Sequence, residues 1–469
     1  MTDDQFDLIV IGLGPGGEEV AERMAEAGWS VLGIDSRLVG GECPYYGCIP
    51  SKMMIRAAEM LTDGRYVNDL AGTAQVTPDF SKPAARIRDE ATDNWDDRVA
   101  VERLQNLGAT FVRGAARLAG RDDDGRIRVA VGEQTYAARH VVVGVGTAPA
   151  IPPIDGLADL PRGIDGLVWT NREAIRSPVV PASLVTLGGG AIGIELSQAA
   201  ARFGAKISVV EAAPRILHIE EPEASAAVAE VLTAEGIQVR AGARATHVAA
   251  GGEGVVVTLD DGSTVTGEKV LVAVGRRSNT LDLALDTVGL AADLRTVDVD
   301  DAMRVLHDGA PIDGLYAVGD STGRGAFTHV AVWQARVLIG RMLQRDEPFG
   351  GYRGLAWVTF SDPEVGRVGM TEQQARDAGL TVRTGTAQIA TSTRGWIYGK
   401  GNAGLVKLVE DADRGVLVGA TVVSPHGGEI LGMLTLAVHA EVPVSTLGTM
   451  HYAYPTLHRT VLDAVRELS

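Results

Sequence analysis

The sequence predicts an α/β protein with more than one domain, and three observations support this. A short apolar strand followed by a glycine-rich turn and a helix occurs near the N-terminus, and the same pattern recurs with its glycine turn at Gly188. The chain has 469 residues, which is too long for one ordinary hydrophobic core and indicates two to four domains. Its 58 glycines are a high number and suit many tight junctions between strands and helices.

The first of these patterns opens the chain. The apolar strand 7–11 leads directly into Gly12-Leu13-Gly14-Pro15-Gly16-Gly17, and a helix is expected over 18–28. A second strand, 30–34, ends at Asp35. A G-x-G-x-x-G turn between a strand and a helix, inside a β-α-β unit, predicts a Rossmann-like domain that binds a dinucleotide.

The glycines of this turn have separate roles. Gly12 permits the tight turn, Gly14 lets the backbone approach a pyrophosphate, and Gly17 lets helix and strand pack closely. The pyrophosphate would lie at the helix N-terminus, where free N–H groups and the helix dipole favour an anion. Asp35 is placed to accept hydrogen bonds from an adenosine ribose.

The second pattern consists of a strand over 184–187, a glycine turn, a helix through Phe203 and a strand over 207–211. Its candidate cofactor contacts are Gly188, Gly190, Gly193 and Glu211. The acid at Glu211 suits a free ribose 2′-hydroxyl and would repel a 2′-phosphate, so NADH is favoured over NADPH. Arg215 is close enough in sequence to keep NADPH possible. Two dinucleotide sites in one chain imply electron transfer between two nucleotide cofactors.

Three further apolar strands end in glycine-bearing turns. Those at 143–147 and 272–276 indicate crossing points between two nucleotide domains, and their candidate cofactor contacts are Gly146, Thr147 and Gly275. The third strand, 315–319, is tipped by Asp320 and followed by a helix that begins near Phe327. Asp320 could simply cap that helix, but its place after a glycine-bearing strand favours a contact with the ribityl chain of a flavin.

The only two cysteines, Cys43 and Cys48, lie five residues apart in a segment rich in glycine and proline that includes Gly41. On one regular helix their Cα atoms would be roughly 8.7 Å apart, whereas a disulfide needs less than about 7 Å. Pro44 suits the first helical position, which would place Cys43 at or before the N-cap and Cys48 one turn inside the helix. A thiolate there is stabilised by the helix dipole. The pair therefore predicts a redox-active disulfide, with two buried, reduced cysteines as the alternative.

Composition excludes several classes of function. The net charge of −17 argues against nucleic acid or an anionic membrane as a partner. Two cysteines in a long chain fit the reducing cytoplasm, and the acidic residues 1–7 do not resemble a signal peptide. No apolar run approaches the length of about twenty residues that a transmembrane helix requires. No metal site is predicted.

Together these motifs resemble the class I pyridine nucleotide-disulfide oxidoreductase family, which includes dihydrolipoamide dehydrogenase, glutathione reductase and mercuric reductase. The resemblance covers essentially the whole chain and includes a C-terminal segment, 454–457. It implies a discontinuous FAD domain (1–150 and 275–345), an NAD(P)H domain (151–274) and an α+β dimerisation domain (350–469) of a homodimer. Residues 360–365 are expected to form the opening strand of that last domain.

The resemblance also implies roles for single residues. Lys52 would lie near flavin N5 and pair with Glu195, although a surface ion pair of little value is the alternative. Cys48 would face the flavin, and Cys43 would exchange with the substrate. His329 would begin a helix aimed at the pyrimidine edge of the flavin, with simple packing as an equal alternative.

This chain departs from the family pattern near its C-terminus. The family's proton-transferring histidine is replaced by Tyr454, and the glutamate that orients it is replaced by Arg459. A phenol has a pKa near 10, so at neutral pH Tyr454 is a poor proton acceptor. His451 and His458 flank the segment and are the alternatives.

Other replacements surround the cysteine pair. Tyr45 and Tyr46 lie between the cysteines and, with Tyr452 and Tyr454, suggest an aromatic acceptor site that would suit a quinone, although core packing explains aromatics equally well. Glu42 replaces a hydroxyl residue beside the FAD pyrophosphate, where a carboxylate would be repelled unless it turns away.

The sequence therefore predicts a homodimeric FAD-dependent NAD(P)H oxidoreductase. Electrons would pass from NADH through the flavin to Cys43–Cys48 and on to a small-molecule acceptor, either a disulfide or another compound. One alternative is a quinone reductase that uses the flavin directly. Another is a nucleotide-binding redox sensor with low turnover.

Overall fold

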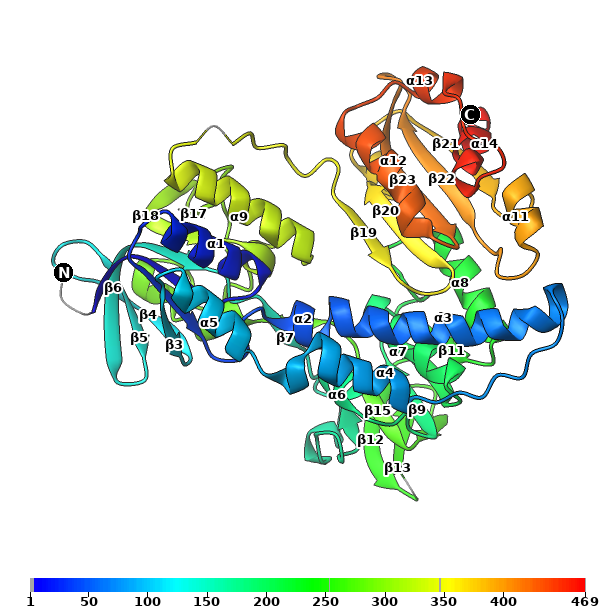
Figure 1. The fold of residues 1–469 in the computed structure, drawn as a ribbon, viewed down its shortest axis with the longest axis horizontal. Helices are drawn as coiled ribbons and strands as arrows, with labels where there is room; N and C mark the ends of the chain where they lie inside the picture. The colour runs from blue at the N-terminus through cyan, green and yellow to red at the C-terminus, as the bar shows by residue number, and fades with distance from the viewer. Residues whose placement is uncertain (1–3, 253, 346, 469) are drawn as a thin grey trace. The chain divides into compact units, whose positions relative to one another are not determined.

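Two units make up the computed structural model of this chain, which describes residues 4–252, 254–345 and 347–468 (Figure 1). Unit 1 contains the chain up to Pro50, Arg86–Pro149 and Arg276–Gly350. Unit 2 contains Ser51–Ala85, Ala150–Gly275 and the chain from Gly351 onward.

Unit 1 is built on a sheet whose main path has the order β17-β18-β6-β1-β2-β3. All pairs along it are parallel except β17 with β18, and a hairpin of β4 and β5 continues from β6. The strands are β1 (Gln5–Ile11), β2 (Val31–Asp35), β3 (Thr110–Arg113), β4 (Ala116–Arg121), β5 (Ile127–Val131), β6 (Gln134–Val143), β17 (Arg304–His307) and β18 (Ala310–Ala317). The helices are α1 (Pro15–Glu26), α2 (Glu42–Tyr46), α5 (Arg98–Asn106) and α9 (Thr328–Met342).

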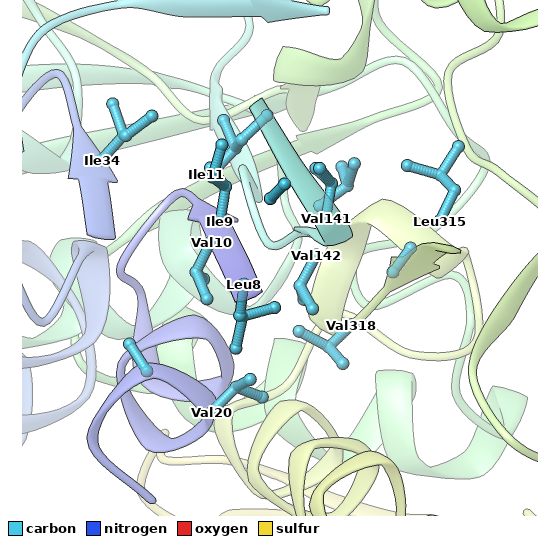
Figure 2. Packing of buried hydrophobic residues seen from close by; sticks show 14 of the residues in the cluster. Leu8, Ile9, Val10, Ile11, Val20, Ile34, Val141, Val142, Leu315 and Val318 are labelled. Carbon is cyan, nitrogen blue, oxygen red and sulfur yellow. The ribbon is translucent and has the colours of Figure 1, made fainter. Parts of the chain in front are cut away.

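The core of unit 1 lies on both sides of β1. Figure 2 shows Leu8 and Val10 extending toward α1, where Val20 lies beside them, while Ile9 and Ile11 extend to the opposite face. All five side chains are buried, as expected for a parallel strand that is covered on both faces. This packing holds the carboxyl end of β1, and with it the glycine turn, against the N-terminus of α1.

Unit 2 contains a second parallel sheet, with the order β11-β10-β9-β15-β8, and an antiparallel sheet of β12, β13 and β14. The strands are β8 (Val168–Trp169), β9 (Ser183–Leu187), β10 (Lys206–Glu211), β11 (Gln238–Ala241), β12 (Ala245–Gly251), β13 (Gly254–Leu259), β14 (Thr264–Gly267) and β15 (Lys269–Val272). The helices of this part are α3 (Cys48–Leu70), which begins in unit 1, α4 (Ser81–Arg86), α6 (Asn171–Arg176), α7 (Ala191–Arg202) and α8 (Pro222–Ala234).

The C-terminal part of unit 2 is an antiparallel sheet of order β19-β20-β23-β22-β21 with helices packed on it (Figure 1). Its strands are β19 (Ala356–Thr359), β20 (Glu364–Gly369), β21 (Val382–Gln388), β22 (Leu405–Asp411) and β23 (Val416–Ser424). Its helices are α10 (Glu372–Asp377), α11 (Thr393–Tyr398), α12 (Gly427–His439), α13 (Val444–Thr449) and α14 (Thr460–Arg466).

The predicted fold class is confirmed: two parallel α/β sheets of the Rossmann type are followed by an α+β sheet. The predicted helix over 18–28 begins earlier, at Pro15, because proline suits the first helical position. Residues 150–275 of unit 2 are inserted between two strands of unit 1, β7 (Thr147–Pro149) and β16 (Arg276–Ser278), which form an antiparallel pair. The boundaries of the separate cofactor and dimerisation domains stay a prediction, and their outer ends at residues 1–3 and 469 lie outside the described residues.

The prediction of an opening strand at 360–365 is wrong. The strand that opens this sheet is β19, and residues 360–363 form the connection to β20. The backbone N–H of Phe360 donates to a carboxylate oxygen of Glu195 at 2.7 Å, and Pro363 has no N–H to donate to a neighbouring strand. This stretch therefore cannot continue the sheet.

Candidate functional site

The N-terminus of α1 is open to a ligand. Gly14 is its N-cap, no side chain caps it, and a Cβ on Gly14 would meet no atom within 4 Å. The neighbouring glycines are crowded: Gly12 has φ +89°, and a Cβ on Gly17 would collide with the carbonyl oxygen of Gly12. The turn is thus tightly packed on the protein side, with free N–H groups on the other side, which fits the pyrophosphate of a dinucleotide.

Asp35 connects this turn to the next one. Its carboxylate accepts the N–H of Leu13 and the N–H of Arg37, each at 2.7 Å. Burial raises the pKa of Asp35. Gly41 packs against the turn as well, because a Cβ there would lie 2.9 Å from the Cα of Gly14. The contact of Asp35 with a ribose stays a prediction.

A cluster of polar side chains in unit 1 connects residues that are far apart in sequence. Thr147 donates from its hydroxyl to Asp320 at 2.6 Å, and Arg276 donates to the hydroxyl and carbonyl oxygens of Thr147 at 2.6 and 2.8 Å. Arg276 also lies 3.6 Å from the carboxylate of Glu42, so the charge of Glu42 is balanced within the protein. Asp320 does not cap α9, because its carboxylate is held by Thr147 and the N-cap of that helix is Phe327.

The two cysteines belong to two different helices. Cys43 lies in the short helix α2, Gly47 interrupts the helical backbone with φ −127° and ψ −114°, and Cys48 is the first residue of α3. The prediction that Pro44 begins the helix is wrong, because Gly41 is the N-cap of α2 and Pro44 lies inside it. Gly47 is the break because its backbone angles lie outside the helical range.

Both cysteines are partly exposed, and each lies at or near the start of its helix. The pKa of Cys43 is raised well above its ordinary range, first because its thiol is hydrogen-bonded to Cys48 and then because it is partly buried. The Sγ atom of Cys48 lies 3.4 Å from the hydroxyl oxygen of Thr328, the first residue of α9. Sequence reasoning predicted the start of this helix but missed Thr328, because a contact across 280 residues leaves no local signal.

In unit 2, the N-terminus of α7 repeats the geometry of α1. Gly190 is its N-cap without a capping side chain, and a Cβ on Gly190 would meet no atom within 4 Å, whereas a Cβ on Gly193 would collide with the carbonyl oxygen of Gly188. Glu211 accepts the N–H of Gly189 and that of Ala213, each at 2.6 Å, as Asp35 does in unit 1. This turn fits a second dinucleotide.

Lys52 and Glu195 meet in unit 2, as predicted. The ammonium of Lys52 donates to Glu195 Oε2 at 2.8 Å, and the other oxygen of Glu195 accepts the N–H of Phe360 at 2.7 Å. The Lys52 ammonium also lies 4.5 Å from the centre of the Phe360 ring. Because the Glu195 side chain is only 7% exposed, this is a partly buried, oriented pair and not a loose surface contact.

The C-terminal segment presents Tyr454 to solvent. Its side chain is 67% exposed, its hydroxyl donates to Thr393 at 3.5 Å, and the guanidinium of Arg459 lies 5.5 Å from its ring. His451 is exposed, and the ring of His458 packs against Tyr452.

Two of the tyrosines expected at an aromatic acceptor site pack elsewhere. Tyr45 is buried in unit 1, where burial raises its pKa to about 12. Tyr452 packs against the core of the C-terminal sheet, and its hydroxyl donates to the carbonyl of Leu447 at 3.0 Å. These two positions fit the alternative of core packing, and the four-tyrosine acceptor site stays a prediction.

Two other predicted cofactor contacts, Gly146 and Gly275, form backbone hydrogen bonds with residues that are distant in sequence. The carbonyl of Gly146 accepts the N–H of Asn279 at 3.1 Å in unit 1, and the carbonyl of Gly275 accepts that of Ala150 at 3.0 Å in unit 2. His329 follows Thr328 on α9, with its ring stacked on Phe327. Among the described residues, no three histidine, cysteine or acidic side chains gather as metal ligands.

Comparison with known proteins decides what this geometry represents. The family model of pyridine nucleotide-disulphide oxidoreductases matches residues 6–335, and the model of their dimerisation domain matches residues 355–465. The chain belongs to the pyridine nucleotide-disulphide oxidoreductase family. Dihydrolipoyl dehydrogenase of Thermus scotoductus is 33% identical over 99% of this chain and 97% of its own length. Mercuric reductase of Streptomyces lividans is 31% identical over 96% of this chain and 94% of its own length.

Solved structures agree with this assignment. LpdA from Mycobacterium tuberculosis has a TM-score of 0.83 at 26% identity, covering 98% of this chain and 99% of that chain. RclA from Escherichia coli, a HOCl-induced flavoprotein disulfide reductase, shares the fold with a TM-score of 0.81 at 24% identity, covering 98% and 99%.

Membership of the pyridine nucleotide-disulphide oxidoreductase family makes this chain an FAD-dependent enzyme that passes electrons from NAD(P)H through the flavin to a disulfide. The dimerisation domain supports a homodimer. None of the described helices combines the length and the apolarity that crossing a bilayer demands. The open N-termini of α1 and α7 fit the two dinucleotides of this family.

Proposed function

We propose that this chain is an NADH-dependent reductase in which the Cys43–Cys48 pair receives the electron pair and passes it to a small disulfide. When bound, FAD accepts the electrons of NADH and delivers them to a disulfide. The observation that carries the proposal is the hydrogen-bonded cysteine pair, with Cys48 at the first residue of one helix and facing the first residue of another. Such a position stabilises a thiolate.

The reaction on the cysteines balances as follows. Two electrons and two protons convert the Cys43–Cys48 disulfide into two thiols, one of which loses a proton. The Cys43 thiol loses its proton as its sulfur attacks a small disulfide acceptor, and this proton goes to the first acceptor sulfur that leaves. The Cys48 thiolate then displaces the second acceptor sulfur, which takes up the proton released earlier, as the Cys43–Cys48 disulfide forms again. The partly exposed position of Cys43 on the short helix α2 suits the exchanging role.

The groups in unit 2 support NADH as the electron donor. Glu211 holds a carboxylate at the end of β10, where it suits a ribose hydroxyl and opposes a 2′-phosphate. Arg215, the residue that kept NADPH possible, donates instead to the carbonyl oxygens of Leu217 and Glu220, at 3.1 and 2.8 Å. The oriented Lys52–Glu195 pair supports its proposed role beside the nicotinamide and the flavin. The site at α1, with Asp35, Gly41, Thr147 and Asp320, is proposed for FAD.

A small disulfide is favoured over a quinone because Tyr45 is buried and Tyr452 packs against the core of the C-terminal sheet, so two of the four expected aromatic side chains are engaged in packing. Tyr454 replaces the family's proton acceptor, and a phenol can donate a hydrogen bond to a thiolate but accepts a proton poorly at neutral pH. Because the exchanging thiol must lose its proton and Tyr454 does not take it at neutral pH, we expect the rate of disulfide reduction to increase toward alkaline pH. Only two cysteines in a chain of 469 residues fit a reducing compartment, which supports a cytoplasmic location.

Cysteine variants test this function. Cys43→Ser and Cys48→Ser should each lower NADH-dependent reduction of small disulfides by at least about a hundredfold, because either change prevents the exchange. Reduction of a quinone or dye by the same variants serves as the control, since direct flavin chemistry does not need the cysteines. If both variants reduce disulfides at the wild-type rate, the proposed route is wrong, and if only quinones are reduced by the wild type, the quinone reductase alternative is correct.

A further inference from the structure

We propose that Thr328 is a positioning residue of the cysteine pair: its hydroxyl donates a hydrogen bond to Cys48 and keeps the negative charge of the reduced pair on that sulfur. The inference rests on the proposed function, because it concerns the reduced form of the same two cysteines. Neither the family match nor the sequence pattern points to this threonine.

The geometry of the contact is the first support. The hydroxyl oxygen of Thr328 lies 3.4 Å from Cys48 Sγ, within hydrogen-bond range for sulfur. Thr328 is the first residue of α9, a helix of 15 residues whose N-cap, Phe327, has no side chain that could cap it. A hydroxyl at this place adds a directed donor to the field of the helix N-terminus, which by itself favours an anion.

The second support is that Cys43, the other cysteine of the pair, holds its proton more tightly than an ordinary cysteine. The pKa of Cys43 is raised because its thiol is hydrogen-bonded to Cys48 and because of burial, while Thr328 opposes the rise. Cys43 therefore keeps its proton and donates it toward Cys48. Because Thr328 acts on the pKa of Cys43 as well, the preference for Cys48 rests on the 3.4 Å contact of its sulfur with the Thr328 hydroxyl.

The charged groups of the neighbouring elements are already engaged. Glu42 on α2 pairs with Arg276, and Lys52, four residues beyond Cys48 on α3, pairs with Glu195. The titratable side chain next to Thr328 on α9 is His329, whose ring is stacked on Phe327. Since Tyr454 cannot become a cation as the family's histidine does, an uncharged donor inside the chain gains importance for the thiolate.

The test uses the FAD-loaded dimer in a Cys43→Ser background, in which no disulfide forms and Cys48 titrates without a reductant. The long-wavelength absorption band of a thiolate next to oxidised flavin is followed against pH. We expect its midpoint to lie below the ordinary cysteine value of about 8.5. Adding Thr328→Val or Thr328→Ala should raise the midpoint by about one to two pH units, because one charge-assisted hydrogen bond is lost.

Two controls separate a hydrogen bond from a structural effect. Thr328→Ser keeps the hydroxyl and should leave the midpoint unchanged, and Thr287→Val changes an exposed threonine of the same unit. An unchanged midpoint in both hydroxyl-free variants, or the absence of the band in the Cys43→Ser protein at every pH, would overturn the inference. Because this titration needs no turnover, it remains readable if the enzyme fails to reduce small disulfides.

Discussion

At the scale of single residues, the site depends on carboxylates whose oxygens are already engaged. Asp35 and Glu211 each accept two backbone N–H groups and so hold the glycine turns before any ligand binds. Glu195 is held in the same way by Lys52 and by the backbone of Phe360. Such preorganised carboxylates have little freedom to lose when a cofactor binds.

Glu18 gives a prediction at this scale. It lies in the first turn of α1, next to Arg103, and burial raises its pKa to about 7. The folded protein then binds more protons than the unfolded chain between its ordinary value and about pH 7, so stability falls as pH rises through this window. We expect the free energy of unfolding of the wild type to fall by about 1–3 kcal/mol across this window because of Glu18, and we expect Glu18→Gln to remove this fall.

The measurement is denaturant unfolding of wild type and variant at about pH 5 and about pH 8. Glu26→Gln, on the exposed part of the same helix, is the matched control and should keep the wild-type dependence on pH. If Glu18→Gln changes with pH as the wild type does, the carboxyl of Glu18 is not the group responsible.

At the scale of elements, the parts that sequence predicts well are those specified by neighbouring residues. The two glycine turns could be predicted because their packing requires glycine at fixed positions. One glycine has no room for a side chain and another leaves the helix N-terminus accessible, and together they give a recognisable spacing in the sequence. The start of α2 was not, because both Pro44 and Gly41 can begin a helix and only the packing of Gly41 on Gly14 decides between them.

The start of helix α7 gives a prediction that distinguishes Gly193, where a side chain has no room, from Gly190, where a side chain would meet no atom of the protein. Gly193→Ala should destabilise unit 2 by about 2 kcal/mol or more, because its Cβ collides with the carbonyl of Gly188. Gly190→Ala meets no atom and should leave stability nearly unchanged, but its methyl group would obstruct a pyrophosphate and weaken NADH binding by about tenfold or more. Thermal unfolding and NADH titration of both variants check this. The reverse pattern would show that the turn does not hold the cofactor.

At the scale of the whole molecule, the contacts that the sequence did not reveal are those between distant segments. Thr328 lies opposite Cys48, and Arg276 balances Glu42, although nothing in either local sequence indicates it. Another example is Lys407 of β22, which is buried in unit 2 and paired with Glu221 and Glu372. Paired charges at such depth join segments that the sequence shows only as separate motifs.

The central claim is that electrons from NADH come to rest on Cys43 and Cys48. The most direct test is an anaerobic titration of the oxidised enzyme with NADH, in which new thiols are counted and the visible spectrum is recorded. We predict that one equivalent of NADH produces two thiols per chain and a long-wavelength thiolate–flavin band while the main flavin absorption persists. Bleaching of the flavin without new thiols would contradict the account, because the electrons would then remain on the flavin.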